Sequence, residues 1–455
     1  MSFIRIKKSG QSKYAYEVTT YWDKESKVSR QKVKYLGRVD DDGNVSRVEQ
    51  LQLDYGDTYL IKEFISKSIV SPILQNLADS FPEIMPLICY CLCQQSAMYN
   101  ASTWYEGNAV NMLYPAKMSS QNISRILASM GNENIQRQFF KQYTSLLNSD
   151  GGVIIDATSL PNASSIGFNA WGYNDSGISK QLRLLFAVDD RTKLPIFFRY
   201  LPGNLLDIST LKSTVLELKQ LGVPFRFALI DAGYMSSENV QTLYKNQIDF
   251  LTRLPSNRKL YKALINQHVQ DLETAKYAVK YGNRGLFVKQ IPVEFEEQQA
   301  YAYVVLDPVR KGKELNSVIT ITEDISDSAL YNCGTMILVS SISIGAKNVV
   351  EHYYSRQAVE QIFGFCKSDL QILPLRRHND ATIRGLLLLQ FITLIIFIQM
   401  REALAGKYTV EQALMCARNV KCKIYGQKMI IAEFNKKQKE IYKLCNVCHC
   451  ITCSS

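Results

Sequence analysis

The chain has 455 residues, of which 46% are hydrophobic and 21% charged, and this composition is that of a globular protein with roughly two to four domains. Its 53 Lys and Arg residues outnumber the 42 Asp and Glu residues, and the net charge of +11 favours a polyanionic partner without naming one. The 11 Cys residues are an odd number without a framework spacing, which argues against a secreted, disulfide-bonded protein.

The first part of the chain is expected to form strands and then helices. Within residues 1–55, short runs from Tyr14 onward predict strands that carry many basic side chains: Lys27, Arg30, Lys32, Lys34 and Arg38. Within residues 56–148, the apolar residues recur at three- and four-residue spacing, which predicts helices. We therefore expect a basic β-rich N-terminal segment followed by a helical DNA-binding region.

The middle of the chain alternates strands and helices. Residues 149–256 have the order β-β-β-α-β-α-β, which predicts a mixed sheet with helices on its faces. Strand-like runs at residues 257–345, among them VITITED, predict a β-rich insertion. Residues 346–405 are expected to be helical, and the apolar run from Gly385 to Met400 is short for a bilayer span and predicts a buried helix. Residues 406–455 are expected to form a helical C-terminal region with a Cys-rich tail, whose spacing does not suit a zinc site.

Two aspartates follow apolar runs that are typical of buried strands. Asp156 follows GVII and Asp231 follows FALI. A carboxylate at the exit of a buried strand loses hydration, and a divalent cation is one compensation. For either residue alone, hydrogen bonding to the next backbone amides is the commoner role. Other acids have simpler explanations: Asp189 and Asp190 fit a hairpin turn, and Asp207 fits a helix N-cap.

A polar stripe follows further along the chain. Tyr353 is followed at three, seven and fourteen positions by Arg356, Glu360 and Lys367, and at 100° per residue the four lie within about 60° on a helix. Such a stripe is often only a solvated face with an i,i+4 pair. Here it stands downstream of the two aspartates, which favours a shared function. A further basic cluster comes after it: Arg376, Arg377, His378 and Arg384.

The spacing Tyr-x2-Arg-x3-Glu-x6-Lys, with the two aspartates and the Pro-Gly-Asn turn at residues 202–204, resembles DDE-type bacterial insertion-sequence transposases of the insertion-sequence-four type. The resemblance covers about Gly151 to Leu404. The segment YWDKESKVSRQKVKYLG also looks like the N-terminal segment of one subgroup. The resemblance implies an α/β fold with a ribonuclease H-like mixed-sheet core, which is split by the β-rich insertion.

The resemblance also implies what the site residues do. Asp156, Asp231 and Glu360 would be catalytic and would hold two Mg²⁺ ions, for which Mn²⁺ can substitute. Contacts with DNA are expected from one tyrosine and several basic residues: Tyr353, Arg356, Lys367, Lys180, Arg376 and Arg377. For Lys180 an ordinary exposed side chain is the alternative. Trp171 could stack on an unpaired base, but packing is the expected role.

These residues predict a DNA transposase that binds the ends of its insertion sequence and catalyses metal-dependent cleavage and strand transfer. The expected partner is double-stranded DNA, both the element ends and the target DNA. We expect a homodimer in the DNA complex and no association with a membrane. The polar start of the chain lacks a secretory signal, so we expect the protein in the bacterial cytoplasm, at the nucleoid. Two alternatives stay open: a ribonuclease H-like nuclease without strand transfer, and a catalytically inactive, transposase-derived DNA-binding protein.

Overall fold

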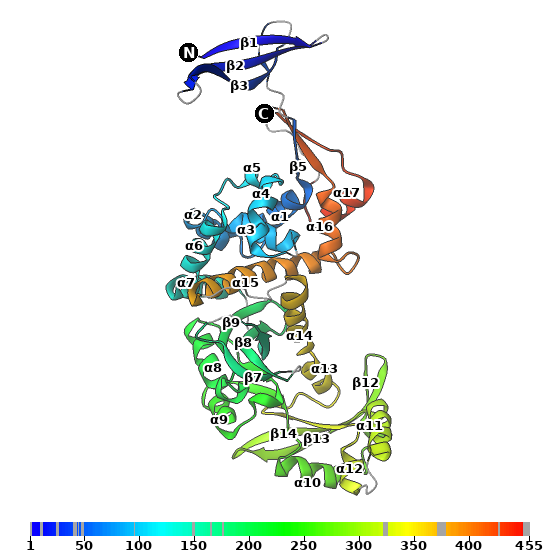
Figure 1. Ribbon diagram of the computed structural model, residues 1–455. Coiled ribbons are helices and arrows are strands. Elements are labelled where there is room, and N and C mark those ends of the chain that lie inside the picture. Colours follow the sequence, from blue (N-terminus) through cyan, green and yellow to red (C-terminus); the bar gives the residue numbers. More distant parts are fainter. Residues whose placement is uncertain are drawn as a thin grey trace. The chain divides into compact units, whose positions relative to one another are not determined.

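The computed structural model describes residues 2–9, 12–23, 27–39, 43, 45–46, 50–94, 96–147, 151–163, 166–174, 177–321, 326–370, 379–425 and 428–448. The chain divides into two compact units (Figure 1). Unit 1 combines Met1–Ser66, Asn100–Ala116 and Met400–Ser455. Unit 2 combines Lys67–Tyr99 and Lys117–Gln399.

An antiparallel sheet begins unit 1. Its strands are β1 Ser2–Ser9, β2 Ser12–Asp23, β3 Val28–Val39 and β4 Val45–Ser46, in this order across the sheet. β2 and β3 are strands that the sequence predicts. β1 lies before the predicted strands; its run FIRIKKS mixes apolar and basic residues, and it forms a strand because it pairs with β2 along its whole length.

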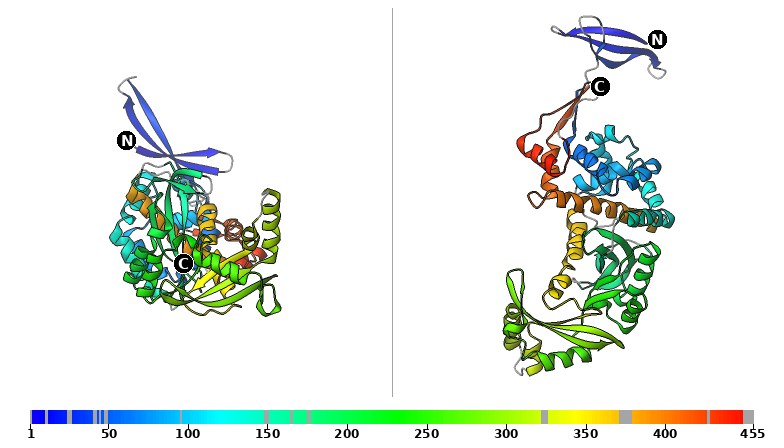
Figure 2. Two further views of the ribbon diagram at one scale, coloured as in Figure 1. Left: turned by 90° about the horizontal axis from the view of Figure 1, so that it is seen from below. Right: turned by 180° about the vertical axis from the view of Figure 1, so that it is seen from behind.

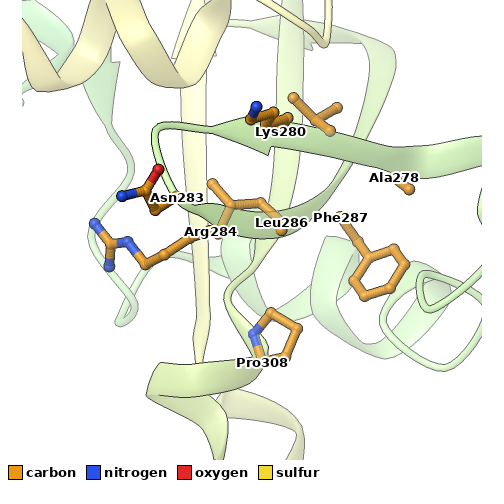
Figure 3. Close-up of a pocket in the computed structure, with 9 residues that line it drawn as sticks. Ala278, Lys280, Asn283, Arg284, Leu286, Phe287 and Pro308 are labelled. Atoms are coloured by element: carbon orange, nitrogen blue, oxygen red, sulfur yellow. The ribbon is translucent and has the colours of Figure 1, made fainter.

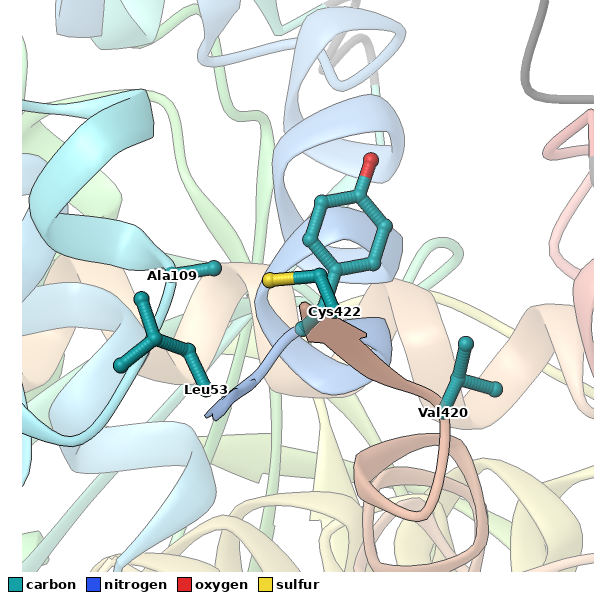
Figure 4. Close-up of a cluster of buried hydrophobic side chains, with 5 residues drawn as sticks. Leu53, Ala109, Val420 and Cys422 are labelled. Atoms are coloured by element: carbon teal, nitrogen blue, oxygen red, sulfur yellow. The ribbon is translucent and has the colours of Figure 1, made fainter. Parts of the chain in front are cut away.

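A second sheet in unit 1 joins distant parts of the chain. β16 Lys421–Tyr425 lies between β17 Lys428–Ile431 and β5 Gln50–Asp54, and both pairs are antiparallel. The C-terminal region, which was expected to be helical, therefore also contains strands, because KCKIY pairs with a segment that no local pattern reveals. A buried cluster lies beside this sheet (Figure 4): Leu53, Tyr55, Ala109, Val420 and Cys422.

The helices of unit 1 come from three separate segments. They are α1 Gly56–Ser66, α4 Ala101–Glu106, α5 Val110–Leu113, α16 Val410–Arg418 and α17 Lys436–Leu444. The N-terminus of α16 has a capping box in which the Thr409 hydroxyl and the Gln412 side chain each accept the other residue's backbone N–H. An ion pair ties α16 to α1, with Arg418 Nε 2.8 Å from Oδ2 of the fully buried Asp57.

Unit 2 is built on a sheet that has ten strands within the described residues. They are β6 Gly152–Pro161, β7 Ala170–Asn174, β8 Gly177–Asp189, β9 Pro195–Pro202, β10 Phe227–Ile230, β11 Asp249–Arg253, β12 Ala278–Tyr281, β13 Arg284–Phe295, β14 Gln298–Leu306 and β15 Thr335–Ser340. The order is β12-β13-β14-β15-β11-β10-β6-β8-β7, and β9 also pairs with β8. β6, β10 and β11 are parallel, and the other neighbours are antiparallel. The predicted mixed α/β sheet is confirmed.

The predicted β-rich insertion extends this same sheet. β15 pairs with β14 on one edge and with β11 on the other, so the inserted strands continue the first ones. One expected strand is a helix instead, because the start of VITITED forms the end of α11 Pro308–Ile321. The Asp307 side chain accepts hydrogen bonds from the backbone N–H groups of Val309 and Arg310, and this cap starts a helix that overrides the β-branched residues of its last turn.

Helices cover both faces of the sheet in unit 2 (Figures 1 and 2). The helices of this unit, of which α2, α3 and α6 lie beyond α15 and not on the sheet, are α2 Ser71–Ser80, α3 Ile84–Cys93, α6 Ser120–Met130, α7 Glu133–Leu146, α8 Leu211–Gln220, α9 Ser237–Lys245, α10 Lys259–His268, α11, α12 Asp327–Asn332, α13 Val349–Tyr354, α14 Gln357–Gly364 and α15 Asp380–Ala403. On one face, the ring of Phe186 contacts Phe363 of α14 and Phe391 of α15. On the other, Arg199 of β9 pairs with Glu217 of α8.

Helix α15 forms part of the core of unit 2. By length and composition it could cross a membrane, but 89% of its most apolar stretch is buried inside the protein. Gly385 lies so close to α6 that a Cβ added there would stand 1.8 Å from the Leu127 carbonyl oxygen. We therefore interpret α15 as the buried helix that the sequence predicts.

Candidate active site

Two of the predicted carboxylates are neighbours because of the register between β6 and β10. These parallel strands pair Ile155 with Ile230, so the next residues, Asp156 and Asp231, lie side by side. β10 ends at this point, whereas β6 continues to Pro161 along β8. Asp156 therefore lies inside a strand that runs past the end of its neighbour, and the expectation that its own strand ends there is wrong.

The third carboxylate, Glu360, comes from α14. The sequence predicts one continuous helix through the polar stripe, but α13 ends at Tyr354 and α14 begins at Gln357. A π-helical turn follows at Phe365–Asp369. Arg356 lies at the break, in the N-cap position of α14. No Gly or Pro marks this break in the sequence, and π-turns are frequent at functional sites.

Arg356 joins the three carboxylates. Its Nη1 lies 3.2 Å from Asp156 Oδ2 and 3.2 Å from Asp231 Oδ1, and its Nη2 lies 3.1 Å from Glu360 Oε1. The side chain of Asp156 is 13% exposed, that of Asp231 37% and that of Glu360 52%, so the group opens towards solvent on the Glu360 side. Acids from two strands and a helix thus meet at one guanidinium.

The surroundings of Asp156 stabilise its negative charge less well than water does. The pKa of Asp156 is raised to about 7, chiefly by burial; nearby Asp231 and Asp207 also raise it, whereas Arg356 and the Ala157 N–H lower it. Because burial is the main cause, further positive charge beside Asp156 would stabilise its ionised form.

The chemistry of these residues suits a hard divalent cation, whereas their present spacing does not. Carboxylate oxygens are the ligands that Mg²⁺ prefers. Two buried atoms in the same region, Tyr234 Oη and Arg183 Nε, have no hydrogen-bond partner within the described part of the chain. In that part, no group of three or more His, Cys, Asp and Glu side chains is arranged to hold a metal ion as it stands. The three acids are arranged around Arg356 instead.

Tyr353 and Lys367 have different surroundings. Tyr353 is only 5% exposed, and its ring centroid lies 5.8 Å from Cζ of Arg356. Its ring supports the guanidinium through a cation–π contact and is not open to a DNA strand in this conformation. Lys367 Nζ donates to Thr158 Oγ1 at 2.7 Å. Thr158 is two residues beyond Asp156 on β6, hence on the same face of the sheet.

The remaining predicted DNA-contacting residues are less closely tied to the carboxylates. Lys180 is exposed on β8, and strand alternation places it on the same sheet face as Asp156. Arg376 and Arg377 lie outside the described residues. Trp171, opposite Lys180 in the β7–β8 pair, is 63% exposed, so the packing role expected for it is wrong. Among the described strands, β7 has β8 as its one neighbour and lies at the edge of the sheet.

A second ion pair beside the carboxylates was not predicted from the sequence. Arg183 Nη2 lies 2.6 Å from Oδ1 of Asp207, whose side chain does not cap a helix as expected. Asp207 is near enough to raise the pKa of Asp156. The only local signal was its place just after the Pro-Gly-Asn turn, where a capping role is the ordinary interpretation.

A polar cavity of about 370 Å³ adjoins Thr158. It is lined by Ala157, Thr158, Ser159, Pro161, Tyr173, Asn174, Arg183 and Lys367. No acid lines it; of its two cations Arg183 is paired with Asp207, and Lys367 gives the cavity the positive charge that suits an anion such as a phosphate. It begins one residue beyond Asp156 on the same strand.

Another cavity, of about 700 Å³, lies at the β12–β13 hairpin and the start of α11. Figure 3 shows Arg284 and Asn283 at one end and Phe287 towards the other, with Pro308 across from them. None of its lining residues belongs to the carboxylate group, and we assign it no role.

The N-terminal sheet has a strongly basic side, here called the basic face. Residues opposite each other in antiparallel strands share a face, and on this one Lys8 lies opposite Lys13 and Glu17 opposite Lys34. Its exposed basic residues are Lys8, Lys13, Arg30, Lys32 and Lys34. Lys8 and Lys13 repel each other, and the five exposed basic side chains outnumber the one acid, Glu17, so this face favours binding to a polyanion.

The comparison with known proteins agrees with the geometry. No curated protein sequence matches the chain. One similar solved structure is the cryo-EM structure of a piggyBac transposase synaptic complex with hairpin DNA, with 12% identity over 86% of this chain and 79% of that chain and a TM-score of 0.40. Residues 148–396, more than half of the chain, match the family model of the transposase DDE domain, and this match shows that the chain belongs to the DDE transposase family.

Proposed function

We propose that this transposase binds the ends of an insertion sequence, cleaves the DNA there and joins those ends to target DNA. Family membership makes the chain a DNA-processing enzyme that uses a divalent metal. The observation that carries the finer proposal is the convergence of Asp156, Asp231 and Glu360 on one guanidinium. Partial burial of three acids from separate elements around one cation costs desolvation energy, and a common functional site accounts for that cost.

The topology of unit 2 supports a ribonuclease H-like core. β6, β8 and β9 form an antiparallel meander, and β10 and β11 add in parallel on the other edge of β6. Helices cover both faces. The first strand carries Asp156, and Asp231 directly follows β10, so the topology itself brings the two acids together.

The assignment to the insertion-sequence-four type is supported by the four signature residues. Arg356 and Glu360 take part in the carboxylate group, Lys367 binds Thr158 next to it, and Tyr353 supports Arg356. All four serve one site even though the helix that carries them is broken.

Asp156, Asp231 and Glu360 would hold two Mg²⁺ ions, with Mn²⁺ as a substitute. When bound, such ions activate a water or a 3′-hydroxyl and stabilise the leaving oxygen of an in-line displacement. The carboxylates must offer ionised oxygens in one place. Asp156 has to lose its proton to do so, and its burial opposes that loss.

DNA would be held at two places on the chain. We propose that Lys367 and the polar cavity bind a phosphate next to the scissile bond, with Lys180, Arg376 and Arg377 as further phosphate contacts. The basic face of the N-terminal sheet would hold a separate stretch of duplex. Such contacts fix the position of DNA without reading its sequence. We also propose that the protein acts as a homodimer that holds two DNA ends. We propose that it lies in the bacterial cytoplasm, at the nucleoid.

The test uses the purified full-length protein, Mg²⁺ and labelled DNA taken from the two sides of the gene. Asp156→Asn, Asp231→Asn and Glu360→Gln should each lower cleavage by more than about a hundredfold, because even residues that only support metal ligands cost about 10- to 100-fold when lost. Glu238→Gln removes an exposed carboxylate that pairs with Lys212 and should leave cleavage unchanged.

The products separate the alternatives. Joined products support a transposase, whereas cleavage without joining would support a nuclease. Binding of DNA without cleavage in the wild-type protein would support a protein that has lost its chemistry. Full cleavage by all three carboxylate variants would show that the active site lies elsewhere.

A further inference from the structure

Arg356 fills the place that the metal would need. Its two terminal nitrogens lie 3.1–3.2 Å from an oxygen of each of the three carboxylates. Mg²⁺ holds its oxygen ligands at about 2.0–2.1 Å, so the carboxylate oxygens must turn from the guanidinium to the metal. Within the described ranges, no set of three acidic, His or Cys side chains is arranged for a metal ion. The site shown here is therefore the guanidinium-bound form.

A guanidinium and a divalent cation oppose each other at this distance. Both carry positive charge, and both use the same carboxylate lone pairs. The side chain of Arg356 is 19% exposed, and that of its partner Glu360 is 52% exposed, so one side of the ion-pair group is open to solvent. An arginine fork pairs with phosphate as well as with carboxylate, and a DNA phosphate approaching from this side offers Arg356 a replacement partner.

We propose that Arg356 exchanges partners, pairing with the three carboxylates in the free protein and with a DNA phosphate in the complex, so that metal loading depends on its departure. This inference rests on the proposed function only in taking the carboxylates as the metal ligands. Tyr353 keeps the arginine near the site through its ring contact during the exchange. By linkage, metal and DNA each raise the affinity of the protein for the other.

The test measures Mn²⁺ binding to the free, full-length protein by electron paramagnetic resonance, without DNA. Arg356→Gln should bind Mn²⁺ about tenfold or more tightly than the wild type, in the range of ordinary coupling between two sites. Arg356→Lys keeps the positive charge but loses the fork, and its affinity should lie between the two. A merely structural role of Arg356 predicts weaker binding in both variants.

Arg310→Gln is the matched control, because Arg310 forms the same kind of i,i+4 pair with Glu314 on α11 and does not contact the carboxylates. It should keep the wild-type affinity for Mn²⁺. Lys367→Gln removes a neighbouring cation that binds Thr158 and should change metal affinity far less than Arg356→Gln.

Adding element-end DNA completes the test. DNA should raise the Mn²⁺ affinity of the wild type, and it should raise that of Arg356→Gln much less. Unchanged or weaker Mn²⁺ binding by Arg356→Gln and Arg356→Lys, with binding lost in Asp156→Asn, would overturn the exchange and leave the metal site standing. Lack of Mn²⁺ binding by every protein, with and without DNA, would overturn both the exchange and the proposed metal site.

Discussion

The negative charge of Asp156 is unfavourable in the folded protein without metal or DNA. Burial raises its pKa from the ordinary 3.8 to about 7, against the pull of Arg356 and the Ala157 N–H. Between these two values the folded state binds more protons than the unfolded state. Stability from this group is therefore present at low pH and is lost as the pH rises towards and through 7.

We expect the melting temperature of the metal-free protein to fall between about pH 5 and about pH 8. Asp156→Asn should make this fall smaller, because it removes the titrating group, and Glu238→Gln should keep the wild-type slope. Circular dichroism melts in EDTA at several pH values measure all three. An equal slope in Asp156→Asn would mean that the proton on Asp156 does not control stability.

For single residues, the sequence predicted which side chains form the site but not the ion pairs between them. The spacing of the polar stripe predicted Glu360 and Arg356 on one side of a helix, and they do form an i,i+4 pair. The contact of Arg356 with Asp156 spans 200 residues, and no periodicity reports it. The Arg183–Asp207 pair was missed for the same reason.

Among the elements, two helices owe their close contact to glycine. A Cβ added at Gly385 of α15 would stand 1.8 Å from the Leu127 carbonyl oxygen of α6. A Cβ at Gly131 would stand 1.8 Å from the Ala381 carbonyl oxygen. The sequence predicted both helices. It did not predict where they cross, because that depends on which small residues face each other.

Gly385→Ala should destabilise the protein by about 1–3 kcal/mol, because backbone has to move to admit one methyl group. Gly312→Ala is the matched control: it also lies inside a helix, α11, but an added Cβ there meets nothing within 4 Å. It should gain about 0.5–1 kcal/mol from the better helix propensity of Ala. Urea unfolding of both variants tests the contrast, and equal effects would argue against the close crossing.

On the scale of the whole molecule, unit 1 is assembled from the two ends of the chain and one internal segment. β5 pairs with β16 across more than 360 residues, with Asp54 opposite Lys421. The Tyr442 hydroxyl donates to the Gly56 carbonyl oxygen at 2.5 Å. Local patterns predict strands and helices but carry no information on such distant partners, so the assembly of unit 1 could not be predicted.

Arg418→Met should destabilise the protein by about 3 kcal/mol, because it leaves the carboxylate of Asp57 buried without its charged partner. Lys407→Met breaks an exposed pair with Glu440 in the same unit and should leave stability almost unchanged. Differential scanning calorimetry of the two variants measures the difference. Similar melting temperatures would show that the buried pair does not hold the ends together.

The pairing of β11 with β15 gives the insertion a modular character. The chain leaves β11 after Arg253 and comes back beside β11 at Leu338, which is the direct register partner of Arg253. Residues 254–337 therefore form an insertion whose two ends lie next to each other, as the two ends of a hairpin loop do. If a short turn replaced this insertion, the strands that carry the carboxylates would keep their present pairing. It would also expose the edge of β15 that β14 now covers, which is the kind of edge that promotes aggregation.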